Sequence, residues 1–179
     1  NQNPPVGYGD GSQNGLTINV QSGASVIGTG AGFGLGTGNT INNDGTISDD
    51  GSNPTTFNGI TGLFSASVTV NNNATVIIYE TTNDPAANLI GINVVNVTGG
   101  NARSITLNAT GATSNEVVGI NADNVTFTNT GTMTVTGSAA AGTFGIFGLT
   151  SVNVTNSGSI TANGGTGCTA IAGSSRECR

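Results

Sequence analysis

The side chains that could do acid–base chemistry in this chain are nine carboxylates, because the sequence contains no histidine and no lysine. A Ser–His–Asp or Cys–His catalytic set is therefore impossible. Enzymes that cleave polysaccharides need carboxylates gathered at one site, and only Asp49 and Asp50 are adjacent here. Such an enzyme would be indicated if four acids converged in one groove: Asp44, Asp49, Asp50 and Asp123. Without a visible cluster, the sequence predicts a protein that is not an enzyme and that holds no cofactor.

A second candidate for chemistry is the segment DGSQNG, residues 10–15, which partly resembles the start of a calcium-binding loop. Asp10, Ser12 and Asn14 occupy ligand positions of that loop. Its twelfth position is Gln21, however, where calcium binding requires a glutamate. We therefore expect a solvated turn and no metal site.

Cys168 and Cys178 are the two cysteines of the chain. A metal site would need further ligands close by, and no histidine exists to supply them. A disulfide that closes a short loop is favoured over two free thiols. Such a bond would place the protein in an oxidising, extracytoplasmic compartment.

The charge balance excludes two classes of partner. Charged residues make up 7% of the chain, the net charge is −6, and three arginines are the only cations. Nucleic acids and anionic membrane surfaces are bound through clustered Lys and Arg, so neither is expected as a partner. The apolar runs are far shorter than the roughly 20 residues that span a bilayer, so we predict no membrane insertion by this segment.

A repeat in the sequence predicts the strands and turns that position the candidate residues. Segments such as VTFTNTGTM, residues 125–133, and VNVTNSGSI, residues 152–160, alternate apolar with polar residues around a polar break, which is typical of short strands joined by turns. Between them, a glycine followed by an aliphatic residue recurs at intervals of roughly 20 to 30 residues, a period that indicates stacked repeats. These pairs are Gly15–Leu16, Gly34–Leu35, Gly59–Ile60, Gly91–Ile92, Gly119–Ile120 and Gly145–Ile146, with Ala170–Ile171 as a degenerate copy.

The repeat predicts an all-β fold, a β-solenoid of about seven coils with three short strands in each coil. A single coil cannot bury its inward face, whereas stacked coils share one continuous core. The alternation identifies the inward residues of two neighbouring coils. They are Val125, Phe127 and Met133 in one coil, and Val152, Val154 and Ile160 in the next.

The polar breaks are expected to be corners of the solenoid. We expect the glycines to be there because a sharp corner often requires a positive φ, and the asparagines to stack in a ladder that pairs their amides along the solenoid. This structural role is favoured over ligand binding. The corner residues are Asn43, Gly45, Asn129, Gly131, Asn156 and Gly158.

The repeat also divides the chain. Residues 1–14 form a tail or a cap outside the repeat, residues 15–171 form the solenoid, and residues 172–179 form a tail with the disulfide loop. One insertion, residues 80–89, is expected to project from the surface. It is the candidate interaction loop, with Glu80, Asn83, Asp84 and Pro85.

Threonines at alternate positions raise a different possibility, because flat arrays of threonine on a β-solenoid can bind ice. Every second residue from Thr126 to Thr136 is a threonine. Ice binding would require Thr-X-Thr to be aligned on successive coils, and the next coil offers Asn153 and Thr155. We therefore expect the array not to repeat cleanly.

With VTFTNTGTM, VNVTNSGSI and the recurring Gly–Ile pairs, residues 15–171 resemble the passenger regions of Gram-negative autotransporters. The resemblance implies a right-handed parallel β-helix that is displayed on, or released from, the outer membrane surface. It also implies adhesion, aggregation or virulence, and it brings no catalytic residues.

The expected function is accordingly that of an extracellular or bacterial cell-surface structural protein that mediates adhesion or self-association, with filaments stacked end to end as one form. Its expected partners are further copies of the chain or molecules of a host or cell surface. Two alternatives stay open: a glycan-binding or glycan-processing β-helix, and a soluble virulence ligand for a host receptor.

Overall fold

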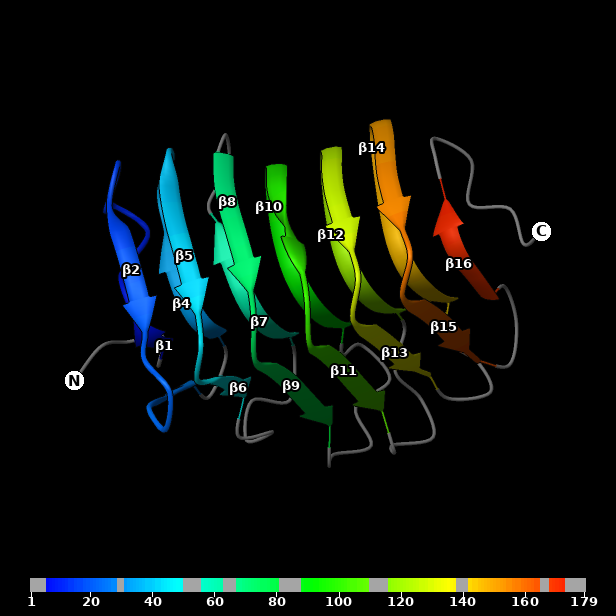
Figure 1. Cartoon of the computed structure of the whole chain (residues 1–179), viewed down its shortest axis with the longest axis horizontal. Coiled ribbons are helices and arrows are strands. Elements are labelled where there is room, and N and C mark those ends of the chain that lie inside the picture. The colour runs from blue at the N-terminus through cyan, green and yellow to red at the C-terminus, as the bar shows by residue number, and fades with distance from the viewer. Residues whose placement is uncertain are drawn as a thin grey trace.

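The computed structural model describes residues 6–28, 31–49, 56–62, 67–80, 88–109, 116–137, 142–164 and 168–172. Within these ranges the protein is an all-β parallel solenoid without helices (Figure 1). Its strands are β1 (Val6–Tyr8), β2 (Thr17–Val20), β3 (Ser25–Gly28), β4 (Ala31–Leu35), β5 (Asn39–Asn43), β6 (Thr46–Asp49), β7 (Thr56–Gly62), β8 (Ser67–Asn72), β9 (Thr75–Glu80), β10 (Asn88–Asn101), β11 (Ser104–Ala109), β12 (Glu116–Asn129), β13 (Thr132–Thr136), β14 (Gly142–Asn156), β15 (Ser159–Asn163) and β16 (Cys168–Ala172).

The strands form three stacks that run along the long axis of the molecule (Figure 1). The first stack contains β1, β4 and β7, the leading parts of β10, β12 and β14, and then β16. The second stack contains β2, β5 and β8, followed by the trailing parts of β10, β12 and β14. The third stack is a separate sheet, with the order β3-β6-β9-β11-β13-β15. Each described strand thus pairs in parallel with the strand one turn away along the chain.

About three turns are regular, residues 88–109, 116–137 and 142–164. In each, a strand of 14 or 15 residues passes through the first and second stacks, and a strand of 5 or 6 residues lies in the third. The predicted parallel β-solenoid is confirmed. The predicted number of about seven coils, with three short strands in each, is wrong, because only about three turns are regular and each of them has one long and one short strand. Strands β1 to β9 add shorter, interrupted segments to the same stacks.

The corner between the first and second stacks is continuous in the long strands and interrupted between β4 and β5. The strand β10 passes through it at Asn93-Val94-Val95-Asn96. Between β4 and β5 the chain instead passes through Gly38, whose φ is +70°. Glycine adopts that left-handed conformation without steric cost, which lets the chain turn there.

Inward-pointing residues from all three stacks form one core. Phe127 is 2% exposed, and Val125 and Met133 are fully buried, as the alternation predicts. The predicted inward residues of the last regular turn, Val152 and Ile160, are only partly buried but pack against the same core. Full burial of one such side chain contributes about 1.5–3 kcal/mol, so the interior turns are held more firmly than the ends.

One core position shows how neighbouring turns adjust to each other. Ile41, Val70, Gly99 and Phe127 follow one another in register along the second stack. Gly99 has a φ of +112°, and a Cβ on it would overlap the backbone of Val70. Gly99, the position of this column that has no side chain, therefore lies beside Phe127, which has the largest one. The large ring compensates for the missing side chain and keeps the core filled.

Candidate functional sites

A ladder of five asparagines runs along the corner between the second and third stacks. The Nδ2 of each asparagine donates a hydrogen bond to the Oδ1 of the next, over distances of 2.8, 2.7, 2.8 and 2.8 Å. The members are Asn43, Asn72, Asn101, Asn129 and Asn156. The ladder expected from Asn43, Asn129 and Asn156 is therefore present. Asn72 and Asn101 were not predicted to belong to it, because their corners, NNNATV and GGNARS, lack the Asn-X-Gly pattern.

The four buried members of the ladder have no capacity left for a ligand. Its first four members are 0–1% exposed. Each of them also donates to a carbonyl oxygen of the next turn, as Asn72 does to Ser104 over 3.0 Å and Asn129 does to Ser159 over 3.1 Å. Since every buried polar group must be satisfied, these amides are part of the structure.

The corner glycines have a different cause from the one expected. Gly45, Gly131 and Gly158 are not among the glycines with positive φ. A Cβ at these positions would instead overlap the backbone of the preceding turn, at Ala24, Arg103 and Gly131 respectively. Close approach of successive turns therefore selects glycine at these corners.

The carboxylates do not form a cluster in the part of the chain that is described. No group of three or more His, Cys, Asp or Glu lies together there. Asp44 lies in the turn after β5 and accepts a hydrogen bond from Asn73 over 3.1 Å, whereas Asp123 lies within β12. Asp49 is the last residue of β6, and Asp50 lies outside the described residues.

The DGSQNG segment is a hydrogen-bonded turn. Oδ1 of Asp10 accepts bonds from the Ser12 hydroxyl, the Ser12 N–H and the Gln13 amide, over 2.6, 3.0 and 2.8 Å. These bonds, with the Ser12 hydroxyl first, hold the pKa of Asp10 below its ordinary value. The carboxylate is thus occupied by its own loop.

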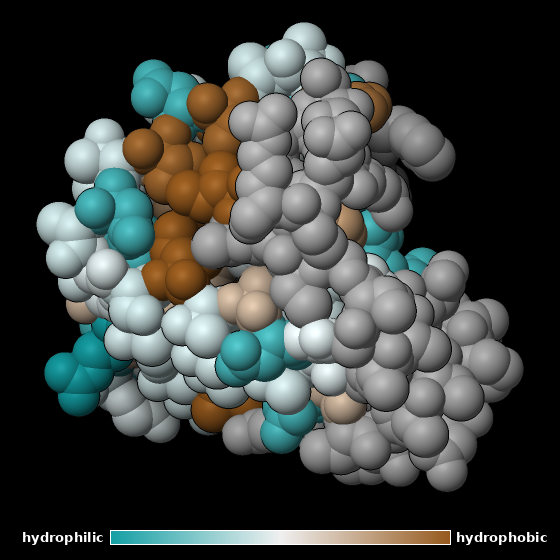
Figure 2. Space-filling view, turned by 90° about the vertical axis from the view of Figure 1, so that its right-hand side faces the viewer, coloured by the Kyte–Doolittle hydropathy of each residue, from teal (hydrophilic) through white to brown (hydrophobic). Residues whose placement is uncertain are grey.

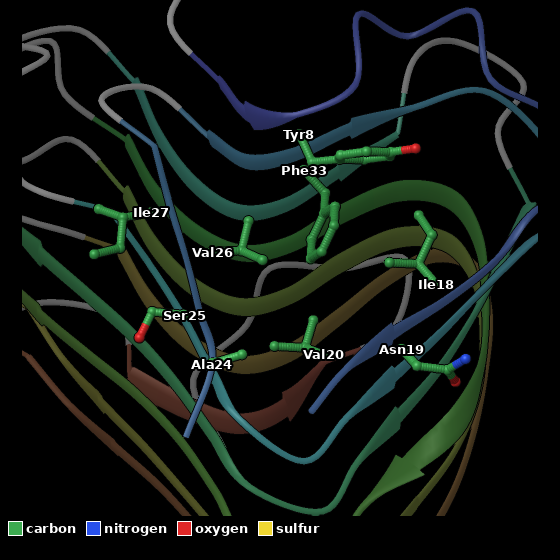
Figure 3. Close-up of a pocket in the computed structure, with 9 residues that line it drawn as sticks. All are labelled: Tyr8, Ile18, Asn19, Val20, Ala24, Ser25, Val26, Ile27 and Phe33. Carbon is green, nitrogen blue, oxygen red and sulfur yellow. The ribbon is translucent and has the colours of Figure 1, made fainter. Parts of the chain in front are cut away.

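Within the described residues, apolar side chains of the core are exposed at both ends of the solenoid. At the end formed by β1, β2 and β3, a hollow of about 450 Å³ is lined chiefly by apolar side chains (Figure 3). Tyr8, which is 45% exposed, contacts Phe33 there edge-on, with ring centroids 6.0 Å apart. Figure 2 faces the opposite end, where hydrophobic atoms are also open to view. Val154 and Ile160 are partly buried in that end region, and Ile171 is 38% exposed.

Two predicted sites cannot be placed. Asn83, Asp84 and Pro85 of the candidate interaction loop lie outside the described residues, and Glu80 is the last residue of β9. Cys168 begins β16, whereas Cys178 lies outside the described residues, so the structure gives no support for the disulfide. Both remain predictions from the sequence.

The alternating threonines do not lie on one face. Thr126 and Thr128 belong to β12 and point outward from the second stack, whereas Thr132, Thr134 and Thr136 belong to β13 in the third. The corner at residues 130–131 separates the two groups. Threonines that share one face must therefore be sought on successive turns and not along a single turn.

No protein-family model matches the chain, and no curated protein or solved structure matches it either. Among the described residues, no helix is long and apolar enough to cross a membrane. The resemblance to autotransporter passengers therefore stays a prediction from the sequence, and the structure supports the parallel β-solenoid.

Proposed function

We propose that this chain is a non-enzymatic structural module of an extracellular or bacterial cell-surface protein, and that it mediates adhesion or self-association. The proposal includes a right-handed solenoid, because crossovers between parallel strands of one sheet are almost always right-handed. It rests chiefly on one observation, the uncovered apolar hollow at the end formed by β1, β2 and β3.

Open strand edges accompany that hollow. Within the described strands, β2 pairs only with β5, β3 only with β6, and β15 only with β13. An unpaired edge presents a row of backbone donors and acceptors, which pairs readily with another strand. A second copy could therefore continue the hydrogen-bonding ladder while it covers the apolar end.

The two ends present matching side chains. Along the second stack, the core column that begins at Ile18 ends at Val154. In the third stack, the column that begins at Val26 ends at Ile160. Stacking end to end would place apolar residues on apolar residues in both columns. At the end formed by β14 and β15, the strand β16 extends only the first stack, whereas β1, β2 and β3 begin all three stacks at the other end. A dimer that joins two copies through the end formed by β1, β2 and β3 is therefore the competing arrangement.

The test is electron microscopy and sedimentation of the purified chain, with and without reductant. We expect concentration-dependent dimers or fibres. A monodisperse monomer at high concentration would contradict self-association, and a requirement for oxidant would implicate the cysteines.

Three variants locate the contact. Ile27, at the rim of the hollow, is 57% exposed, and Leu149 in β14 is 54% exposed. Ile27→Asp is expected to weaken association strongly, because it places a charge at the apolar end. Leu149→Asp places a charge at the opposite end, which end-to-end stacking also uses, and should weaken association as well. Ala102→Asp, at an exposed corner of an interior turn, is the control. Equal effects of Ile27→Asp and Ala102→Asp would argue against the hollow as the contact.

A further inference from the structure

The outer face of the second stack carries two columns of uncharged polar residues, interrupted at one position by Gly100. The first column crosses six strands in register: Thr17, Thr40, Thr69, Thr98, Thr126 and Asn153. Two residues further along each strand lies the second column: Asn19, Asn42, Asn71, Gly100, Thr128 and Thr155. We call these two columns the Thr/Asn face.

The backbone sets a regular lattice on this face. Neighbouring strands are about 4.8 Å apart, and alternate residues of a strand are about 6.6 Å apart. Such a lattice presents polar groups at fixed spacings in two directions, as binding to a surface of ordered water requires. The array extends over six strands, so many lattice points are presented at once.

The side chains of the face are also held in place. Threonine is β-branched and therefore stiff at χ1. Hydrogen bonds link Asn42 to Asn19 over 2.8 Å, Asn71 to Asn42 over 2.9 Å, and the hydroxyls of Thr69 and Thr98 over 2.9 Å. Little side-chain entropy remains to be lost when such a face meets a rigid surface.

Exposure and charge fit a surface of ordered water. Thr98, Thr126 and Thr128 are exposed, and neither column contains a charged residue. Each threonine presents a hydroxyl that can bond water and a methyl group that can lie against it. A rigid array of this kind can order water into a layer that joins an ice surface.

The outer face of the third stack provides an internal comparison. One of its columns is entirely Ser and Thr, but the other contains Ile27 and Ile77 among hydroxyl residues. Two isoleucines thus interrupt the polar residues of that face, whereas the Thr/Asn face carries no apolar side chain and is interrupted at Gly100.

We propose that the Thr/Asn face binds ice. Of the six strands of the face, only β12 carries Thr-X-Thr, at Thr126 and Thr128, so the proposal rests on the single threonine column from Thr17 to Thr126 and not on a double one. This inference goes beyond adhesion or self-association and concerns a different surface, so either can fail without the other. The absence of aromatic side chains from both columns favours ice over a sugar polymer, since sugar rings stack on aromatic faces.

The test measures freezing-point hysteresis and inhibition of ice recrystallisation by the purified chain. The double variant Thr98→Tyr/Thr126→Tyr should reduce both activities several-fold, because two bulky rings would hold the face away from ice. Tyrosine favours strands, so the fold is expected to persist, which circular dichroism will check. The matched control is Thr132→Tyr, at an exposed threonine in the third stack. It should leave both activities unchanged.

Three results would overturn the proposal. The first is absence of ice activity in the parent chain. The second is equal loss in the control and the double variant. The third is binding to insoluble cellulose or chitin that the double variant abolishes while ice activity is absent, which would assign the face to a polysaccharide.

Discussion

Asn42 and Asn43 are neighbours of the same residue type in β5, yet they belong to two different ladders. Asn42 lies on the outer face, half-buried, and pairs with Asn19 and Asn71. Asn43 lies inside, fully buried, and pairs with Asn72. The hydrogen bond that each amide donates along its ladder measures 2.8 Å.

The difference lies in what each amide would lose if its partner were removed. An outer asparagine can turn to water, whereas an inner one would leave donors or acceptors unsatisfied in a dry interior. The inner ladder is therefore expected to stabilise the stack, while the outer side chains remain available for the surface. Bond length alone does not separate the two roles; burial does.

The largest effect on the free energy of unfolding is expected from a substitution of a buried apolar residue. Phe127→Ala should lower the free energy of unfolding by about 3–5 kcal/mol, because it removes the side chain that fills the core beside Gly99. Thr126→Ala, at the exposed neighbour, should change it by no more than about 0.5 kcal/mol. Urea unfolding of both variants checks this, and similar losses would contradict the assignment of inner and outer residues.

The next effect concerns the buried ladder. Asn72→Ala should lower the free energy of unfolding by about 1–3 kcal/mol, because the Asn43 amide and the Asn101 oxygen each lose their buried ladder partner and keep only one further hydrogen bond. Asn71→Ala, one residue earlier, should cost no more than about 0.5 kcal/mol. Equal costs in chemical denaturation would mean that burial does not distinguish the two ladders.

The smallest effect belongs to the exposed turn at Asp10. Its pKa is lowered by hydrogen bonds from Ser12 and Gln13, so the folded state favours the ionised carboxylate. This contribution is present above the pKa of the unfolded chain and is lost as pH falls through the lower pKa of the folded state. Asp10→Ala should therefore melt slightly lower than the parent at pH 7 and together with it in strong acid. A difference that persists in acid would contradict this origin.

The repeat was enough to predict a β-solenoid, and the alternation of apolar and polar residues was enough to predict the inward residues Val125, Phe127 and Met133. The length of the strands depended on the backbone conformation at the corners, which the sequence pattern does not show. The chain continues as one strand through the corner Asn93–Asn96 but is interrupted between β4 and β5, where Gly38 adopts a positive φ. Reading the repeat as uniform therefore gave too many equal coils.

Alignment between turns was the other feature that the sequence concealed. Thr17 and Thr40 are separated by a shorter stretch of chain than Thr40 and Thr69, since the loops between strands differ in length. The alternating threonines of one turn lie on both sides of the corner after Asn129, so they do not form one array. The sequence pattern of that turn did not reveal the threonines that are in register with Thr126 on other turns. Only the register of the strands shows that Thr98, Thr69, Thr40 and Thr17 continue the column of Thr126.

The comparison between the ladders is tested most directly by two double-mutant cycles. One cycle combines Asn72→Ala with Asn101→Ala in the inner ladder, and the other combines Asn42→Ala with Asn71→Ala in the outer ladder. We predict a coupling energy of about 0.5–3 kcal/mol for the inner pair and additivity within about 0.5 kcal/mol for the outer pair. An inner pair that is additive, or an outer pair that is coupled as strongly, would contradict the account.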